Sequence, residues 1–183
     1  MSEVQSRYAR VADGFGRRVA GVGEDQWSTI TPCPDWDVRA LVSHVIATHE
    51  RVVATVTEST PREVESDGDL TAQWSEASAS VASALDDPAL SSKMISGMFA
   101  DQPFESLVGR LVCADTLFHT WDLARATGQD EHLDPEAVKK AFEFLEPIDD
   151  AIRRPGGFAA KIDPPGDAST QTRFLNFGGR ATS

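Results

Sequence analysis

The chain has 183 residues, 40% of them apolar and 25% charged, so it is long and apolar enough to bury a hydrophobic core. Its formal net charge of −12 argues against nucleic acid and anionic membrane surfaces as partners, because both attract cationic proteins. The longest uncharged run, Ala40 to His49, is too short to cross a bilayer, and charged residues interrupt any N-terminal leader. With only two cysteines, Cys33 and Cys113, we expect a single cytoplasmic domain over residues 1–183 with free thiols.

Two helices are expected in the first third of the chain. Apolar residues recur at three- and four-residue steps between Val4 and Val22, the period of a helix with one buried face. After a proline-containing loop, Asp37 is a plausible N-cap for a second helix that begins at Val38 and carries valines on one face to Val56.

Two more helices and an irregular insert follow. Residues Leu70 to Leu85 predict a third helix, which Asp86, Asp87 and Pro88 end. The pattern from Ser91 to Pro103 is irregular and suggests a short hairpin or a lid. A fourth helix is expected from Phe104 to Thr127, because Gly128 provides a C-terminal stop.

The remaining chain predicts one additional helix and a tail. Asp134 and Pro135 form an N-cap and first helical position, and Pro155-Gly156-Gly157 closes the segment. The tail from Lys161 looks like a loop whose Phe174, Leu175 and Phe177 pack back on the body. Strand signals are nearly absent. The fold class is therefore all-α: a four-helix bundle with an additional C-terminal helix and a short irregular or hairpin insert before the fourth helix.

The fourth helix carries polar residues where an apolar face is expected. At 100° steps, Asp115 falls at the centre of the face formed by apolar residues, and His119 and Asp122 follow at one-turn intervals. A buried carboxylate needs a compensating charge. That charge can be a metal ion, which an Asp and a His at i and i+4 can both reach, or a protein partner: a histidine hydrogen bond, Arg39 or Arg125.

A third ligand has to come from another helix, and the chain has four histidines. His132 lies in a loop among acidic residues and is expected to be solvated. Helical periodicity favours His49 over His44 as the buried histidine of the second helix, since His49 lies among the valines. The residues alone leave this choice open.

Two motifs resemble a known family. Pro32-Cys33-Pro34-Asp35-Trp36-Asp37 through Ser43-His44, and His119-Thr120-Trp121-Asp122-Leu123-Ala124-Arg125 through Gly128, are similar to signatures of the DinB/YfiT-like metalloenzyme superfamily. Within that superfamily, they resemble the branch of mycothiol-dependent maleylpyruvate isomerase and its actinobacterial metal-binding relatives. The segment from Gln171 to Arg180 resembles the usual ending of that branch.

This resemblance implies a divalent metal held by His44, Asp115 and His119 in a four-helix bundle. The branch has a glutamate where this chain has the shorter Asp115. Asp122 is the candidate to orient a histidine from outside the ligand set, with an ion pair to Arg125 or a capping role as the alternatives. Cys33 is interpreted as a packed loop residue, Cys113 as buried, and the four tryptophans as core.

Three functions fit these residues. The leading interpretation is a metal-dependent thiol S-transferase that uses a low-molecular-weight thiol such as mycothiol and an electrophilic small molecule. The alternatives are a mycothiol-dependent isomerase of the maleylpyruvate type and a non-catalytic metal-binding stress protein. Zn²⁺ is the expected ion, while Ni²⁺ and Fe²⁺ also suit two histidines and a carboxylate. Arg39, Arg110 or Arg125 could bind an anionic substrate. We expect a monomer or a homodimer.

Overall fold

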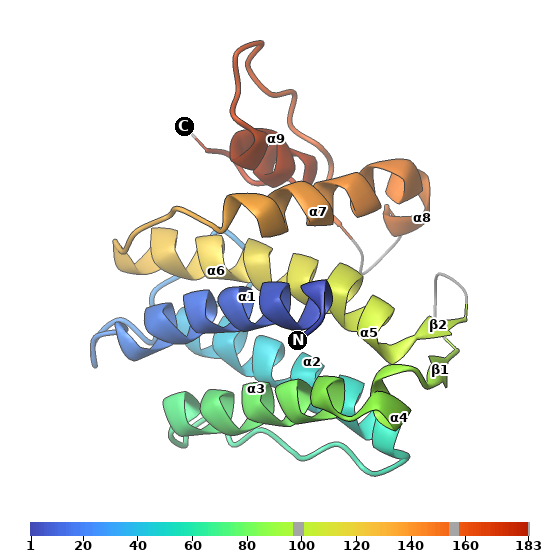
Figure 1. The fold of residues 1–183 in the computed structure, drawn as a ribbon. Helices are drawn as coiled ribbons and strands as arrows, with labels where there is room; N and C mark the ends of the chain where they lie inside the picture. The colour runs from blue at the N-terminus through green and yellow to red at the C-terminus, as the bar shows by residue number, and fades with distance from the viewer. Residues whose placement is uncertain (97–100, 154–157, 183) are drawn as a thin grey trace.

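Four long helices form the body of the computed structural model, which describes residues 1–96, 101–153 and 158–182. They are α1 (Glu3–Ala20), α2 (Val38–Thr57), α3 (Leu70–Asp86) and α6 (Cys113–Thr127). Helix α1 packs against α3 and α6, and α2 packs against the same two helices, so the four close into a bundle (Figure 1). The all-α fold and the four-helix bundle expected from the sequence are confirmed.

Side-chain caps fix where these helices begin. Asp37 accepts a hydrogen bond from the Ala40 backbone N–H at 2.8 Å, which makes it the N-cap of α2 as expected. Asp69 caps α3 in the same way, and Gly128 ends α6 with a left-handed φ of 70°. The short-range signals in the sequence therefore located the ends of the bundle helices well.

The expected fourth helix is continuous but not uniformly α-helical. It consists of α5 (Phe104–Leu107), a π-helical turn (Val108–Val112) and α6. A π turn bonds each residue to the fifth one along, so it changes the phase of every side chain after it. Asp115 is only partly buried, although 100° steps placed it at the centre of an apolar face. Its side chain is 32% exposed.

A small hairpin precedes this helix. After α4 (Pro88–Ser91), strands β1 (Met94–Ile95) and β2 (Gln102–Pro103) pair antiparallel. This confirms the hairpin, one of the two expected forms of the insert. Residues 97–100 lie outside the described chain.

The C-terminal third covers the outer side of α6. Helix α7 (Pro135–Leu145) packs on α6 and continues through a 3₁₀ turn (Glu146–Ile148) into α8 (Asp149–Ile152). The expected stop at Pro155-Gly156-Gly157 lies outside the described residues. Helix α9 (Thr170–Phe177) lies against α7 (Figure 1), and its Phe174 also stacks on Phe118 of α6.

The prediction of a loop-like tail is wrong at α9. Phe174, Leu175 and Phe177 are buried as expected, but they are buried from a helix that Ser169 caps. Helices of this length are not stable alone in water, so tertiary packing rather than local propensity forms α9. Over the described residues, no helix has the length and apolar character needed to cross a membrane.

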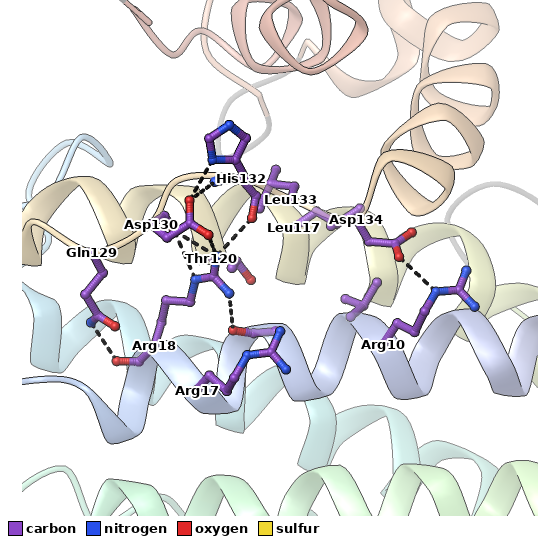
Figure 2. Close-up of a pocket in the computed structure, with 12 residues that line it drawn as sticks. Arg10, Arg17, Arg18, Leu117, Thr120, Gln129, Asp130, His132, Leu133 and Asp134 are labelled. Atoms are coloured by element: carbon purple, nitrogen blue, oxygen red, sulfur yellow. Dashed lines mark hydrogen bonds and ion pairs between the residues drawn. The ribbon is translucent and has the colours of Figure 1, made fainter.

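A cavity of about 500 Å³ lies between α1 and the linker from α6 to α7 (Figure 2). The buried Arg18 crosses it and donates to the carbonyl oxygens of Gly14, Asp130 and His132. Arg10 pairs with Asp134 at 2.8 Å. These two arginines therefore bind the linker between α6 and α7 to α1, and their role here is structural.

A substitution at Gly178, which follows α9, tests how closely the C-terminal tail packs against the bundle. A Cβ on Gly178 would overlap the ring of Phe118, which stacks on Phe174 with centroids 4.0 Å apart. Gly178→Ala should therefore lower the free energy of unfolding by about 1–3 kcal/mol in urea titrations. Gly166→Ala, where no atom lies within 4 Å, is the control and should not destabilise the protein. Equal stability of both variants would contradict the packing described for the tail.

Candidate metal centre

Three potential metal donors converge from α2 and α6. Nε2 of His44 and Nε2 of His119 each lie 3.6 Å from Oδ1 of Asp115, and the three donor atoms lie within 4.8 Å of one another. The imidazole centroids are 5.1 Å apart. The i, i+4 spacing places Asp115 and His119 on one side of α6, and the packing of α2 on α6 brings His44 to them.

These distances suit an ion better than direct contacts. A separation of 3.6 Å is long for a hydrogen bond between N and O. Ligands about 2.0–2.2 Å from a tetrahedral Zn²⁺ lie roughly 3.3–3.6 Å from one another. Oδ2 of Asp115 is buried and has no hydrogen-bond partner. The residues present thus fit a divalent cation.

His119 is held by a chain of buried charges. Its Nδ1 lies 3.2 Å from Oδ2 of the fully buried Asp122, and the carboxylate must accept the hydrogen. Arg180 donates to both oxygens of Asp122, at 3.2 and 2.8 Å. Because Nδ1 of His119 donates, Nε2 keeps the free lone pair that a metal ligand needs.

The charges of the centre shift the pKa values of its groups. Burial raises the pKa of Asp115, but His119 and His44 outweigh burial and hold that pKa well below its ordinary range. Burial lowers the pKa of His119, whereas Asp115 and Asp122 raise it to a net value of about 9. Without an ion, a proton on His119 therefore serves as a positive partner of Asp115, while Asp122 already has Arg180.

His49, which helical periodicity favoured, lies elsewhere. It is fully buried, its Nδ1 lies 2.8 Å from the Val45 carbonyl oxygen, and its ring contacts Trp74 and Tyr8. Burial lowers its pKa to about 4. The periodicity correctly identified the more buried histidine, but the partly exposed His44 is the one that faces Asp115.

The arginine partners named from the sequence are wrong. Arg39 donates to the Ser66 carbonyl oxygen, and Arg125 pairs with Glu131. Neither these two nor Arg110 is among the described residues that line the cavity beside the donors. Asp122 pairs with Arg180 instead of Arg125. His132 is solvated as expected, with a side chain 91% exposed.

A cavity of about 350 Å³ opens beside the three donors. Its further walls come from the loop before α2, from α6 and from the C-terminal segment: Cys33, Pro34, Trp36, Phe118, Phe158, Ala159 and Arg180. The Trp36 ring lies 4.5 Å from the His44 ring and 5.6 Å from the His119 ring, between centroids.

Sequence reasoning missed four of these wall residues. The sequence places Trp36 in the core and Cys33 in loop packing. Both lie in the motif that ends at His44, so their place beside this candidate ligand was a usable signal. Arg180 closes the C-terminal motif without any role assigned to it. Phe158 carried no signal. Cys113 is buried as expected.

A second donor group, Cys33, His119 and Asp122, lies in the same region of the described chain. Asp122 is already neutralised by Arg180, and burial raises the pKa of the Cys33 thiol. A cation among these three would meet the Arg180 guanidinium, so His44, Asp115 and His119 form the better site.

Residues 8–124 match the family model of the mycothiol maleylpyruvate isomerase N-terminal domain, over more than half of the chain. The chain belongs to this family. Uncharacterised proteins of Mycobacterium tuberculosis strains CDC 1551 and ATCC 25618 are both 31% identical to it over 175 residues, covering 94% of this chain and 95% of theirs. No solved structure matches it. The three donors lie inside the matched segment, whereas Phe158, Ala159 and Arg180 follow it.

The raised pKa of His119 predicts a pH-dependent stability for the metal-free protein. The folded value of about 9 exceeds the unfolded value of about 6.5, so the stabilisation is complete below about pH 6.5 and is lost as the pH rises through 9. Urea titrations with a chelator should show a loss on the order of 1–3 kcal/mol over this window.

Asp115→Asn supplies the comparison. It removes the strongest charge that raises the pKa of His119, so its stability should depend much less on pH above about 6.5. A wild-type stability that stays constant from about pH 6.5 to 9 would contradict the charge pairing described here.

Proposed function

We propose that this protein is a divalent-metal-dependent thiol S-transferase that joins a low-molecular-weight thiol, such as mycothiol, to an electrophilic small molecule. The observation that carries the proposal is the convergence of two histidines and one carboxylate at the wall of an open cavity. Three protein ligands leave a coordination position free, as in catalytic rather than structural sites. Family membership supports a thiol as the co-substrate.

A divalent ion bound here would deprotonate a coordinated thiol and so supply a thiolate nucleophile at neutral pH. The chain's own residues prepare the site. Asp122 fixes the tautomer of His119, Arg180 keeps Asp122 ionised, and Trp36 packs beside both histidine rings. Zn²⁺ suits this donor set, as do Ni²⁺ and Fe²⁺.

Transfer forms a carbon–sulfur bond from a sulfur lone pair. The bond from the attacked carbon to its leaving group breaks, and the leaving group departs with that electron pair. The thiol proton passes to solvent. The cavity supplies the room for the electrophile next to the donors.

The isomerase alternative is favoured by the family description, because a maleylpyruvate isomerase uses the same kind of domain. A substrate with two carboxylates, however, needs a cationic side chain to bind it. The Arg180 guanidinium in the cavity already pairs with Asp122, which counts against the isomerase. A non-catalytic stress protein would bind the ion without any thiol dependence.

Metal analysis of paired histidine variants tests the ligand set. His44→Ala should abolish stoichiometric zinc because it removes one of three donors. His49→Leu should retain zinc because His49 lies in the bundle core, among Tyr8 and Trp74. If His49→Leu empties the site while His44→Ala keeps it, the proposed ligand set is wrong.

The pH profile of thiol transfer tests catalysis. Free thiols have a pKa of about 8.5, so an uncatalysed reaction accelerates about tenfold per pH unit below that value. With the ion bound, the rate should be nearly flat above about pH 7.5 because the thiol is already ionised. His119→Ala should restore the climbing profile. A wild-type rate that follows the titration of the free thiol, or that survives metal removal, would overturn the transferase proposal.

A further inference from the structure

The cavity beside the candidate metal centre has aromatic walls. Trp36 lies on one side against the two histidine rings, and Phe118 and Phe158 meet edge to face with centroids 5.3 Å apart. Its volume of about 350 Å³ falls at the lower end of the range for small-molecule pockets. Such walls favour a flat, apolar ligand through burial of its surface against aromatic rings.

The positive charge of the guanidinium in the wall is already paired with a carboxylate. Nε and one terminal nitrogen of Arg180 donate to Asp122, and the other terminal nitrogen donates to the Gly178 carbonyl oxygen at 2.8 Å. The Arg180 side chain is only 12% exposed and lies over the Phe118 ring at 5.0 Å. Arg180 and Asp122 therefore neutralise each other inside the wall.

The remaining charges in the cavity also cancel once the ion and the thiolate are bound. A divalent ion held by Asp115 and two neutral histidines has one excess positive charge, and one thiolate removes it. Burial raises the pKa of the Cys33 thiol, so Cys33 adds no charge. Among the described lining residues, no positive charge is then left for a carboxylate, and burying an unpaired carboxylate is costly.

We propose that the second substrate of this site is a neutral, flat, apolar electrophile, and that the cavity discriminates against electrophiles carrying a carboxylate. This assignment rests on the proposed thiol transfer for the role of the ligand as a substrate. The aromatic walls and the Arg180–Asp122 pair determine the selectivity.

Binding of two isosteric, unreactive probes tests the assignment. The probes are 4-nitrobenzyl alcohol and 4-(hydroxymethyl)benzoate, titrated by calorimetry into the zinc-loaded protein with the neutral thiol 2-mercaptoethanol. The nitro compound should bind at least about tenfold more tightly, since the carboxylate has no partner in the wall. Equal or tighter binding of the carboxylate probe would overturn the assignment.

Two lysine variants provide a gain-of-charge test. Ala159 is exposed and lines the cavity, so Ala159→Lys adds a free ammonium group at its rim. This variant should bind the carboxylate probe more tightly and the nitro probe unchanged, so the ratio of the two affinities should fall severalfold. Ala160→Lys adds the same charge one residue further along, at an exposed position that is not part of the lining, and should leave the preference unchanged. Identical effects of the two variants would contradict selection by the cavity.

The reactive pair 4-nitrobenzyl chloride and 4-(chloromethyl)benzoate separates this assignment from the proposed function. If the thiol is transferred only to 4-(chloromethyl)benzoate, the proposed substrate class is wrong, but thiol transfer itself is supported. A second outcome is that metal-free protein shows the same binding preference and that neither chloride undergoes transfer. This outcome would support the ligand class and count against the transferase.

Discussion

The Asp122 carboxylate is fully buried, and its neutralisation links distant parts of the chain. A buried ionised carboxylate is tolerated only with a close positive partner and complete hydrogen bonding. Arg180 supplies the positive charge from the residues after α9, and His119 donates the remaining hydrogen bond from the same helix as Asp122. One interaction therefore connects the candidate metal centre to the C-terminal segment.

This dependence gives the C-terminal segment a role in the site. The family match ends at residue 124, and the donors His44, Asp115 and His119 lie within it. The wall formed by Phe158, Ala159 and Arg180 comes from residues after that match. A short segment packed through α9 onto α7 thus completes a cavity that the bundle alone would leave open on that side.

Helix α6 is largely buried, yet it presents polar groups to a cavity. Helix α6 packs against α1, α2 and α7, so most of its side chains are buried. The turn at Val108–Val112 changes the phase between α5 and α6. Beyond this turn, Asp115 lies at the cavity wall, with one oxygen buried and its side chain 32% exposed, where an ion can reach it.

The sequence by itself determined the helices of the bundle, because caps such as Asp37 and stops such as Gly128 act within a few residues. It also determined the pairing of Asp115 with His119, which follows from the i, i+4 spacing on one helix. Periodicity reports how deeply a residue is buried, so it ranked His49 above His44, and only the resemblance to a family pointed to His44.

Tertiary structure decided the rest. Which histidine of α2 faces Asp115 depends on how α2 packs against α6, and the form of α9 depends on its burial against α7. The partner of Asp122 was decided in the same way: Arg125 lies three residues away but pairs with Glu131, whereas Arg180 lies 58 residues away and reaches the carboxylate. Charge pairing in a buried site is governed by distance in space, and local sequence patterns carry no information about contacts of that range.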